Sequence, residues 1–290
     1  MKRAAILVVI LALGTLVSAQ TQTPPAQAGA APATTPPPQV GKRPPQAKTQ
    51  AEFDGYKVAA ANTDPVALEK AADDFATKFP ESELRILLYR TAMHSYQSAN
   101  KAEQMMEMGR KVLKIDPDDP EALVGVAQVL AERTRDTDLD KDQRLDEGMK
   151  LAQHAVETTD TDITVPPGTP QDKIDEYKGF LRSNAYYVMG TIQYTREKYA
   201  DAEGYFRKSL DAFPSQPDPL AVLRLALSLD KQEKYPEALK FANQAVQMTE
   251  SSQGSTLATL SRNERDRLVQ LTGGTPAKPP ASAQNPAPKN

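Results

Sequence analysis

The sequence contains no cysteine and no tryptophan, and only two histidines occur among its 290 residues. Without cysteine the chain forms no disulfide bond, no thiolate nucleophile and no cysteine-based metal site. It has no long run of lysine or arginine, and its formal net charge is −3, which argues against a nucleic-acid-binding surface. A glycine-rich phosphate loop and a Gly-x-Ser-x-Gly motif are also missing from the sequence. We therefore expect a binding or structural protein and no enzyme.

A long apolar run is present only at the start of the chain. Lys2 and Arg3 precede an apolar stretch from Ala4 to Val17, and Val17-Ser18-Ala19 has the small residues of a cleavage site. The stretch is shorter than the roughly 20 residues that span a bilayer. Residues 1–19 are therefore predicted to be a signal peptide cleaved after Ala19, and the mature protein is expected to be periplasmic or secreted without inserting into the membrane. Retention as an uncleaved anchor is the alternative.

Proline and aromatic residues divide the rest of the chain. Thirteen of the 24 prolines fall in residues 1–50 and 273–290, whereas all seventeen aromatic residues lie between Phe53 and Phe241. Segments of Pro, Ala, Thr and Gln bury too little apolar surface to offset their loss of conformational entropy on folding. The composition predicts a disordered linker at residues 20–50, a folded body at 51–272 and a disordered tail at 273–290.

The body contains a repeated pattern, which is clearest from Ser183 to Gln216. Its characteristic residues are Tyr186, Met189, Gly190, Tyr199, Ala202, Phe206 and Pro214. This segment resembles the tetratricopeptide repeat, a 34-residue helical hairpin. Small residues let the two helices approach closely, the aromatic residues fill the space around that contact, and the proline ends the second helix.

The same frame fits most of the body. Approximate units are 51–82, 86–119, 120–160 with an insertion, 183–216 and 219–252, followed by a capping helix at 255–272. Asp218 and Pro219 predict a helix N-cap and first turn. The pair Thr169-Pro170 and the apolar spacing after it predict that the first helix of the Ser183 unit starts early and is unusually long. The resemblance implies an all-α fold, a right-handed α-solenoid of helical hairpins with a C-terminal capping helix, flanked by disordered tails.

The insertion in the third unit contains a series of carboxylates. Counted from Asp136, acidic residues fall at positions 1, 3, 5, 7 and 12, which resembles an EF-hand calcium loop. The residues are Asp136, Asp138, Asp140, Asp142 and Glu147. The sixth position is Lys141 rather than the turn glycine, and the ninth is Arg144. We expect no cofactor, and an acidic insertion that caps the following helix competes with the calcium alternative.

The resemblance also implies a binding surface. In tetratricopeptide repeats the first helix of each hairpin faces a concave groove, and the positions that would contact a partner here are Arg90, His94, Gln128, Asn184, Tyr187, Thr191 and Tyr194. The family's groove for a C-terminal carboxylate uses lysines and asparagines. Arg90, His94, Val124 and Gln128 occupy those positions, so that ligand is not supported.

The sequence therefore predicts an exported protein–protein interaction scaffold or adaptor of the cell envelope, which binds a protein or peptide segment on its concave surface. Two alternatives stay open: an accessory factor in secretion or outer-membrane assembly, and a calcium-responsive structural protein that uses the loop from Asp136 to Glu147.

Overall fold

The computed structural model describes residues 41–252 and 254–274. The predicted signal peptide, most of the predicted linker and most of the predicted tail lie outside the described residues. Within them the chain forms α1 Gln50–Ala60, α2 Pro65–Lys78, α3 Arg85–Ser98, α4 Ala102–Ile115, α5 Pro120–Arg133, α6 Lys141–Thr158, α7 Gln171–Thr195, α8 Tyr199–Ala212, α9 Pro219–Asp230, α10 Tyr235–Met248, a short 3-10 helix Glu250–Ser252 and α11 Thr256–Leu271. The only β-type pairing in this part of the chain is an isolated bridge between Lys42 and Thr164. The predicted all-α class is confirmed.

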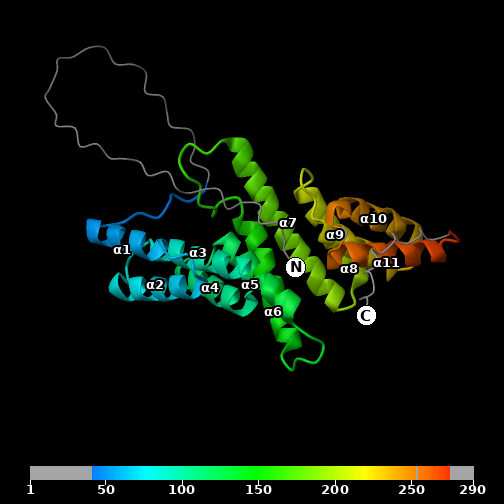
Figure 1. Ribbon diagram of the computed structural model, residues 1–290, viewed down its shortest axis with the longest axis horizontal. Helices are drawn as coiled ribbons and strands as arrows, with labels where there is room; N and C mark the ends of the chain where they lie inside the picture. Colours follow the sequence, from blue (N-terminus) through cyan, green and yellow to red (C-terminus); the bar gives the residue numbers. More distant parts are fainter. Residues whose placement is uncertain (1–40, 253, 275–290) are drawn as a thin grey trace, which may run out of the picture.

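The helices stack in chain order as antiparallel pairs. Each helix packs against the next one, and the first helices of neighbouring hairpins also touch, α5 against α7 and α7 against α9. Figure 1 shows α1 to α4 at one end of the stack, α8 to α11 at the other, and the long α7 running between them. The predicted solenoid of hairpins is confirmed. None of the helices in the described ranges is both long and apolar enough to span a membrane.

Three helices begin with the same Asp-Pro pair. Asp64, Asp119 and Asp218 are the N-caps of α2, α5 and α9, and the side chain of each accepts a hydrogen bond from a backbone N–H in the first turn. Proline fits the next position because its missing N–H would have no partner there anyway. The predicted early start of the long helix α7 is confirmed, with Pro170 rather than Thr169 at the N-cap position. The Thr169 hydroxyl donates instead to the Pro166 carbonyl at 2.7 Å.

The turns inside three hairpins share one geometry. Asn100, Glu197 and Glu233 have φ angles of 56°, 58° and 60°. A lysine follows each of them, and its N–H bonds to the carbonyl five residues earlier, as in Lys198 to Gln193 at 2.9 Å and Lys234 to Leu229 at 3.0 Å. The left-handed residue and the hydrogen bond that spans five residues together end the first helix of the hairpin, as in a Schellman motif. The repeat is therefore visible in the backbone as well as in the sequence.

One close helix contact lies inside the hairpin of α7 and α8. Phe206 and Ala202 on α8 are completely buried, and the Phe206 ring lies against Gly190 on α7. A Cβ at residue 190 would lie 2.7 Å from two atoms of that ring. Glycine is required here because any side chain would overlap the phenylalanine.

The capping helix α11 packs on α10 and α9. The spacing of Leu257, Leu260, Leu268 and Leu271 predicts that these leucines line its inner face, but Leu260 and Leu271 are about half exposed. Leu268 is buried as expected, and Ala258 and Ser261 are buried beside it. Small residues at 258 and 261 let α11 approach closely, so the buried face includes Leu257 and Leu268 but is shifted away from Leu260 and Leu271.

Residues 42–48 belong to the segment whose composition predicted a disordered linker. In the structure they run beside the helical turns and make hydrogen bonds and ion pairs with them. This stretch, which we call the arm, is visible in blue in Figure 1, between the start of α1 and the loop that precedes α7.

Candidate functional site: the first-helix face

The predicted binding residues all lie on the first helices of hairpins. Arg90 and His94 are on α3, Gln128 is on α5, and the other four are on α7: Asn184, Tyr187, Thr191 and Tyr194. We call the surface lined by α3, α5, α7 and α9 the first-helix face. It is the face that the repeat resemblance places on the concave side.

At the α3 end of this face, Arg90 and His94 are already paired within the protein. Arg90 forms an ion pair with Asp119 and lies 3.5 Å from a Glu121 oxygen, and His94 Nε2 lies 2.7 Å from the other Glu121 oxygen. Asp119 is 1% exposed and also caps α5. The first turn of α5 therefore supplies both carboxylates that neutralise the cations of α3.

The long helix α7 completes this cluster. The hydroxyl of Tyr177, in the part of α7 that precedes the repeat unit, donates a hydrogen bond to Glu121. Burial raises the pKa of Glu121, but the positive charges of His94 and Arg90 and the Tyr177 hydrogen bond lower it to about 2. Burial lowers the pKa of His94, and the charge and hydrogen bond of Glu121 more than reverse this and raise it above its ordinary value. Glu121 thus occupies the position in which an external carboxylate would meet Arg90 and His94.

Two of the predicted contact residues are part of the core. Tyr187 is 3% exposed, and its ring centroid lies 5.9 Å from that of Phe206. Thr191 is 5% exposed, and its hydroxyl has no hydrogen-bond partner among the described residues. The prediction that these two side chains are presented to a partner is corrected, because α7 turns them toward neighbouring helices. Tyr186, which was expected to be a core filler, is the more accessible of the two adjacent tyrosines.

The remaining predicted residues line the middle and far end of the face. Gln128 bonds to Glu132 at 3.1 Å on α5, and the Asn184 amide donates to the Phe180 carbonyl at 3.1 Å. Tyr194 is partly buried and carries the Arg224 guanidinium over its ring, 5.5 Å from the centroid. Across the part of the chain that the structure describes, Arg224 has no carboxylate within ion-pair distance. Arg224 is thus a partly buried cation, held in place by an aromatic ring, whose charge is left for a partner.

The carboxylates of the predicted calcium loop are not brought together. Asp136 pairs with Lys141 at 2.8 Å, Asp138 accepts the Arg135 backbone N–H at 2.8 Å, and Glu147 pairs with Arg110 of α4 at 2.8 Å. Asp140 occupies the N-cap position of α6 without a side-chain hydrogen bond, and Asp142 lies in its first turn. Among residues 41–252 and 254–274, no three acidic or histidine side chains are placed to hold a metal ion. Lys141 takes the place of the turn glycine of an EF-hand loop, and its ion pair with Asp136 holds the loop together.

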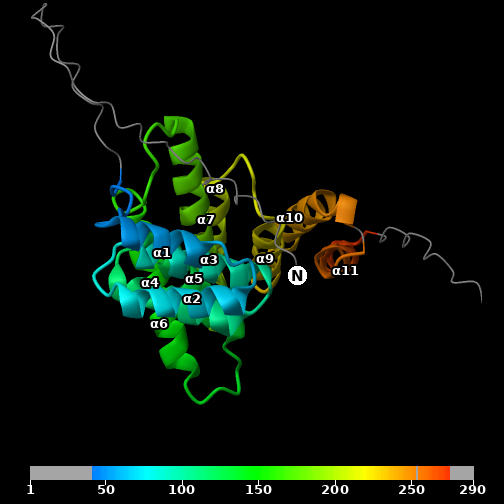
Figure 2. The same ribbon diagram turned by 60° about the vertical axis from the view of Figure 1, so that its left-hand side comes forward.

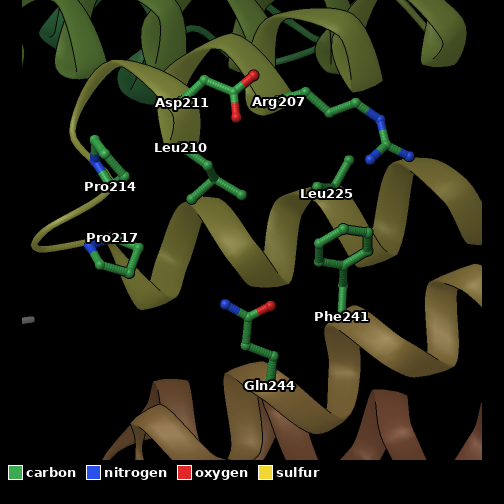
Figure 3. Close-up of a pocket in the computed structure, with 8 residues that line it drawn as sticks. All are labelled: Arg207, Leu210, Asp211, Pro214, Pro217, Leu225, Phe241 and Gln244. Atoms are coloured by element: carbon green, nitrogen blue, oxygen red, sulfur yellow. The ribbon is translucent and has the colours of Figure 1, made fainter.

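A separate pocket lies near the last hairpins. It encloses about 320 Å³ between α8, α9 and α10 and is lined by Leu210, Pro214, Pro217, Phe241 and neighbouring residues (Figure 3). Arg207 lies over the Phe241 ring there, 5.4 Å from its centroid. Unlike Arg224, Arg207 is paired with two carboxylates, Glu203 at 2.9 Å and Glu237 at 2.6 Å.

Sequence reasoning missed Glu121, Tyr177 and Arg224. The Asp119-Pro120 pair was a usable signal for Glu121, because it marks the start of α5 and places residue 121 in a first turn beside α3. Tyr177 belongs to the helical extension before the repeat, so a 34-residue frame assigned it no role. Arg224 lies in a unit that was identified, but its lack of a carboxylate partner is a property of the packed structure.

The comparisons with known proteins agree with this fold. Residues 187–254, from the second half of α7 through α10, match the family model of the tetratricopeptide repeat. A solved structure of pilF from Pseudomonas aeruginosa is 18% identical, covers 77% of this chain and 85% of its own, and has a TM-score of 0.51. A structure of PilW, described as a widely conserved type IV pilus biogenesis factor, is also 18% identical, covers 78% and 87%, and has a TM-score of 0.50. No curated protein matches the chain.

Residues 187–254 thus match the tetratricopeptide repeat, and the stack of hairpins has the fold of tetratricopeptide repeat proteins. The fold is that of a protein-interaction scaffold, a class that is generally not enzymatic.

Proposed function

We propose that this protein is an adaptor that binds an extended partner segment along the first-helix face, between Gln128 on α5 and Arg224 on α9. The partner is a protein or peptide, as expected for a repeat solenoid. A binding role rather than an enzymatic one also agrees with the sequence, which lacks a nucleophile, base and orienting group in any recognisable motif.

The observation that carries this proposal is the unpaired charge of Arg224. Its guanidinium is stacked on Tyr194, and the Tyr194 ring in turn packs edge-on against Tyr199 at 5.3 Å. Arginine and tyrosine are the residues enriched at binding hot spots, and an arginine fixed on a ring loses little side-chain freedom on binding. We infer that the partner segment places an acidic group at this point.

The α3 end of the face contributes less to binding in this arrangement. Arg90 and His94 are both engaged by α5, so an acidic partner group would have to displace Glu121 to reach them. The partner contacts are therefore centred on α7 and α9.

Co-purification from the native host tests this function. Tagged protein with Arg224→Ala or Tyr194→Ala is expected to lose the partner that the unchanged protein recovers. Arg207→Ala is the matched control, since Arg207 is stacked on Phe241 at nearly the same distance but belongs to the second helix α8. Undiminished recovery with the Arg224 and Tyr194 variants, or equal loss with the control, would contradict the proposal.

We further propose that the protein acts in the cell envelope, as an adaptor or as an accessory factor in secretion or outer-membrane assembly. This rests on residues 1–19, whose basic start, apolar run and Val-Ser-Ala ending are those of an export signal. N-terminal sequencing of protein recovered from an envelope fraction should give Gln20 as the first residue. Recovery in the cytoplasm with an unprocessed N-terminus would contradict it.

A further inference from the structure

The arm connects several turns at one edge of the solenoid. Near α1, Arg43 forms two hydrogen bonds to Glu83, at 2.6 and 2.7 Å, and Glu83 also accepts the backbone N–H of Gln46 at 3.1 Å. The Lys48 ammonium donates to the Glu81 carbonyl at 2.9 Å. These contacts fasten the arm to the turn between α2 and α3.

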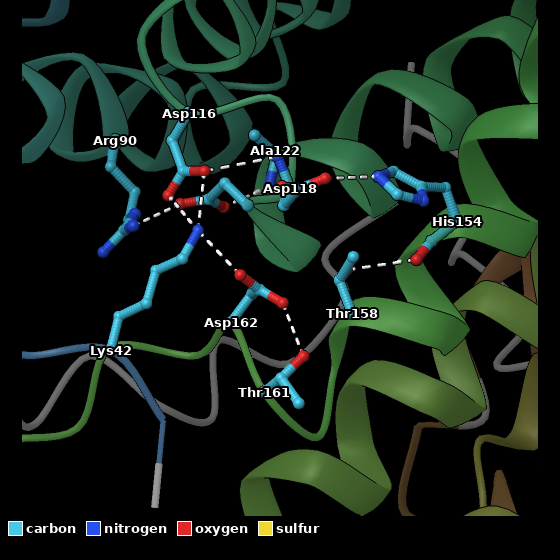
Figure 4. A network of polar contacts seen from close by, with 10 residues as sticks. Lys42, Arg90, Asp116, Asp118, Ala122, His154, Thr158, Thr161 and Asp162 are labelled. Carbon is cyan, nitrogen blue, oxygen red and sulfur yellow. Dashed lines mark hydrogen bonds and ion pairs between the residues drawn. The ribbon is translucent and has the colours of Figure 1, made fainter.

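Further along the stack, Lys42 joins two other connections. Its ammonium lies 2.8 Å from Asp116, between α4 and α5, and 2.8 Å from Asp162, between α6 and α7 (Figure 4). Its backbone N–H donates to the Ile163 carbonyl at 2.9 Å. The preceding Gly41 has φ of 89°, and a Cβ there would overlap that same carbonyl. The backbone conformation of Gly41 and the ion pairs of Lys42 therefore both depend on the docked position of the arm.

The loop held by Lys42 leads directly into the first turns of α7. Asp160 in this loop pairs with Arg182 and, at 3.3 Å, with Lys178, both on α7. Ile163 is 2% exposed and packs in a small apolar cluster with Ile174 and Leu181. Tyr177, between them, donates to Glu121. A continuous series of contacts thus runs from the arm through the loop to the charged cluster at the α3 end of the first-helix face.

We infer that the arm is a clasp that holds the loop at residues 159–170 and the first three turns of α7 against α5. When the clasp is closed, Tyr177 and Glu121 stay engaged with Arg90 and His94. When the arm is released, this part of α7 loosens while the hairpins from α8 onward keep their structure. The Lys42 side chain is 36% exposed and its two aspartates are 19% exposed, so the contact is open enough to water to break without unfolding the core. This inference requires no partner and is independent of the function proposed above.

Hydrogen exchange followed by mass spectrometry on the full chain tests the clasp. Lys42→Gln combined with Arg43→Gln is expected to speed exchange in peptides covering residues 159–182 at least about tenfold, which corresponds to about 1.4 kcal/mol. Peptides from α9 to α11 should be unchanged. Arg207→Gln, which removes a comparable surface arginine with two carboxylate partners, is the matched control and should leave residues 159–182 protected.

Two more variants make the result decisive. Asp162→Asn removes the partner on the loop and should reproduce the effect of the Lys42 change, whereas Lys42→Arg keeps the charge and should retain protection. Faster exchange confined to residues 41–49 would overturn the inference, because the arm would then detach without affecting α7. Faster exchange spread equally over all helices would overturn it as well, since that outcome indicates a general loss of stability.

Discussion

Gly190 and Phe206 show how a single small residue sets the spacing between two helices. The glycine permits the ring to lie directly on the α7 backbone, in a hairpin whose other contacts include the fully buried Ala202. Because interiors are packed to near-crystalline density, the ring has nowhere to move if a methyl group is added.

Gly190→Ala is therefore expected to lower the free energy of unfolding by about 1–3 kcal/mol, the usual cost of overpacking a core. Gly204→Ala is the control on the same hairpin, since a Cβ at residue 204 meets no atom within 4 Å. The control should raise stability by about 0.5–1 kcal/mol, because alanine loses less backbone entropy than glycine in a helix. Urea denaturation of the three proteins measures both effects; a neutral Gly190→Ala would contradict the packing described here.

The cluster of Arg90, His94, Asp119, Glu121 and Tyr177 gives the protein a pH-dependent contact at residue scale. The pKa of His94 is raised in the folded state, so its contribution is fully present below the unfolded value of about 6.5 and is lost as the pH rises through the folded value. The pKa of Glu121 is lowered to about 2, so Glu121 stays ionised across that range.

The stability difference between the unchanged protein and His94→Gln should consequently be largest near pH 6 and shrink toward about pH 9. Denaturation series at several pH values measure this difference. Arg196→Gln, which breaks an exposed ion pair with Asp146, should show no comparable change over the same range. A His94→Gln difference that is constant or grows with pH would contradict the assignment of Glu121 as the histidine's partner.

At the scale of elements, the hairpin turns carry a conformational cost that the sequence does not avoid. Glu197 and Glu233 are exposed and adopt left-handed backbone angles that glycine usually takes at a helix end. A non-glycine residue in this region costs about 1–2 kcal/mol. The glutamates keep this conformation because two features fix the turn: the N–H of the following lysine donates to the carbonyl five residues earlier, and the two helices pack together.

Glu233→Gly is expected to raise the free energy of unfolding by up to about 1 kcal/mol, because relief of the left-handed strain outweighs the larger entropy loss of glycine. Glu237→Gly, four residues later and inside α10, should lower it by a similar amount. Thermal denaturation of the two variants distinguishes them. Destabilisation by Glu233→Gly would show that the glutamate side chain has a role of its own in the turn.

The elements also show what could be predicted from the sequence. Hairpins were predictable wherever a small residue faces an aromatic one at fixed spacing, as Gly190 and Phe206 do, and wherever Asp-Pro marks a helix start. Repeat spacing records the contacts of a residue within its own hairpin. It carries no information about contacts between hairpins, so Tyr177, which meets Glu121 of the preceding hairpin, was assigned to no site. Tyr187 was assigned to the surface because its place on α7 does not show that its ring packs on Phe206. The arm was missed for a related reason: Lys42 and Arg43 are held by ion pairs to distant turns, whereas composition measures only the apolar surface that a segment can bury.

At the scale of the whole molecule, the two ends of the first-helix face differ in character. The α3 end is closed by its own charges, with Glu121 neutralising Arg90 and His94 and the first turns of α7 lying over it. The α9 end presents Arg224 on Tyr194. Figure 2, turned toward the α1 end, shows how far the start of α7 rises beyond the neighbouring hairpins, beside the arm. A partner segment would therefore meet a face whose accessible charge is concentrated toward the C-terminal hairpins.

Site-specific photo-crosslinking in the native host tests the central claim, that a partner binds on this face, most directly. A photoreactive amino acid would replace Gln128, Asn184 or Leu227 on the first helices, or Gln104 or Asn243 on exposed positions of the second helices α4 and α10. We expect a cross-linked product of one discrete mass from the three first-helix positions and none from the two controls. Products from positions 104 and 243 alone, or equal yields from all five, would contradict binding on the first-helix face.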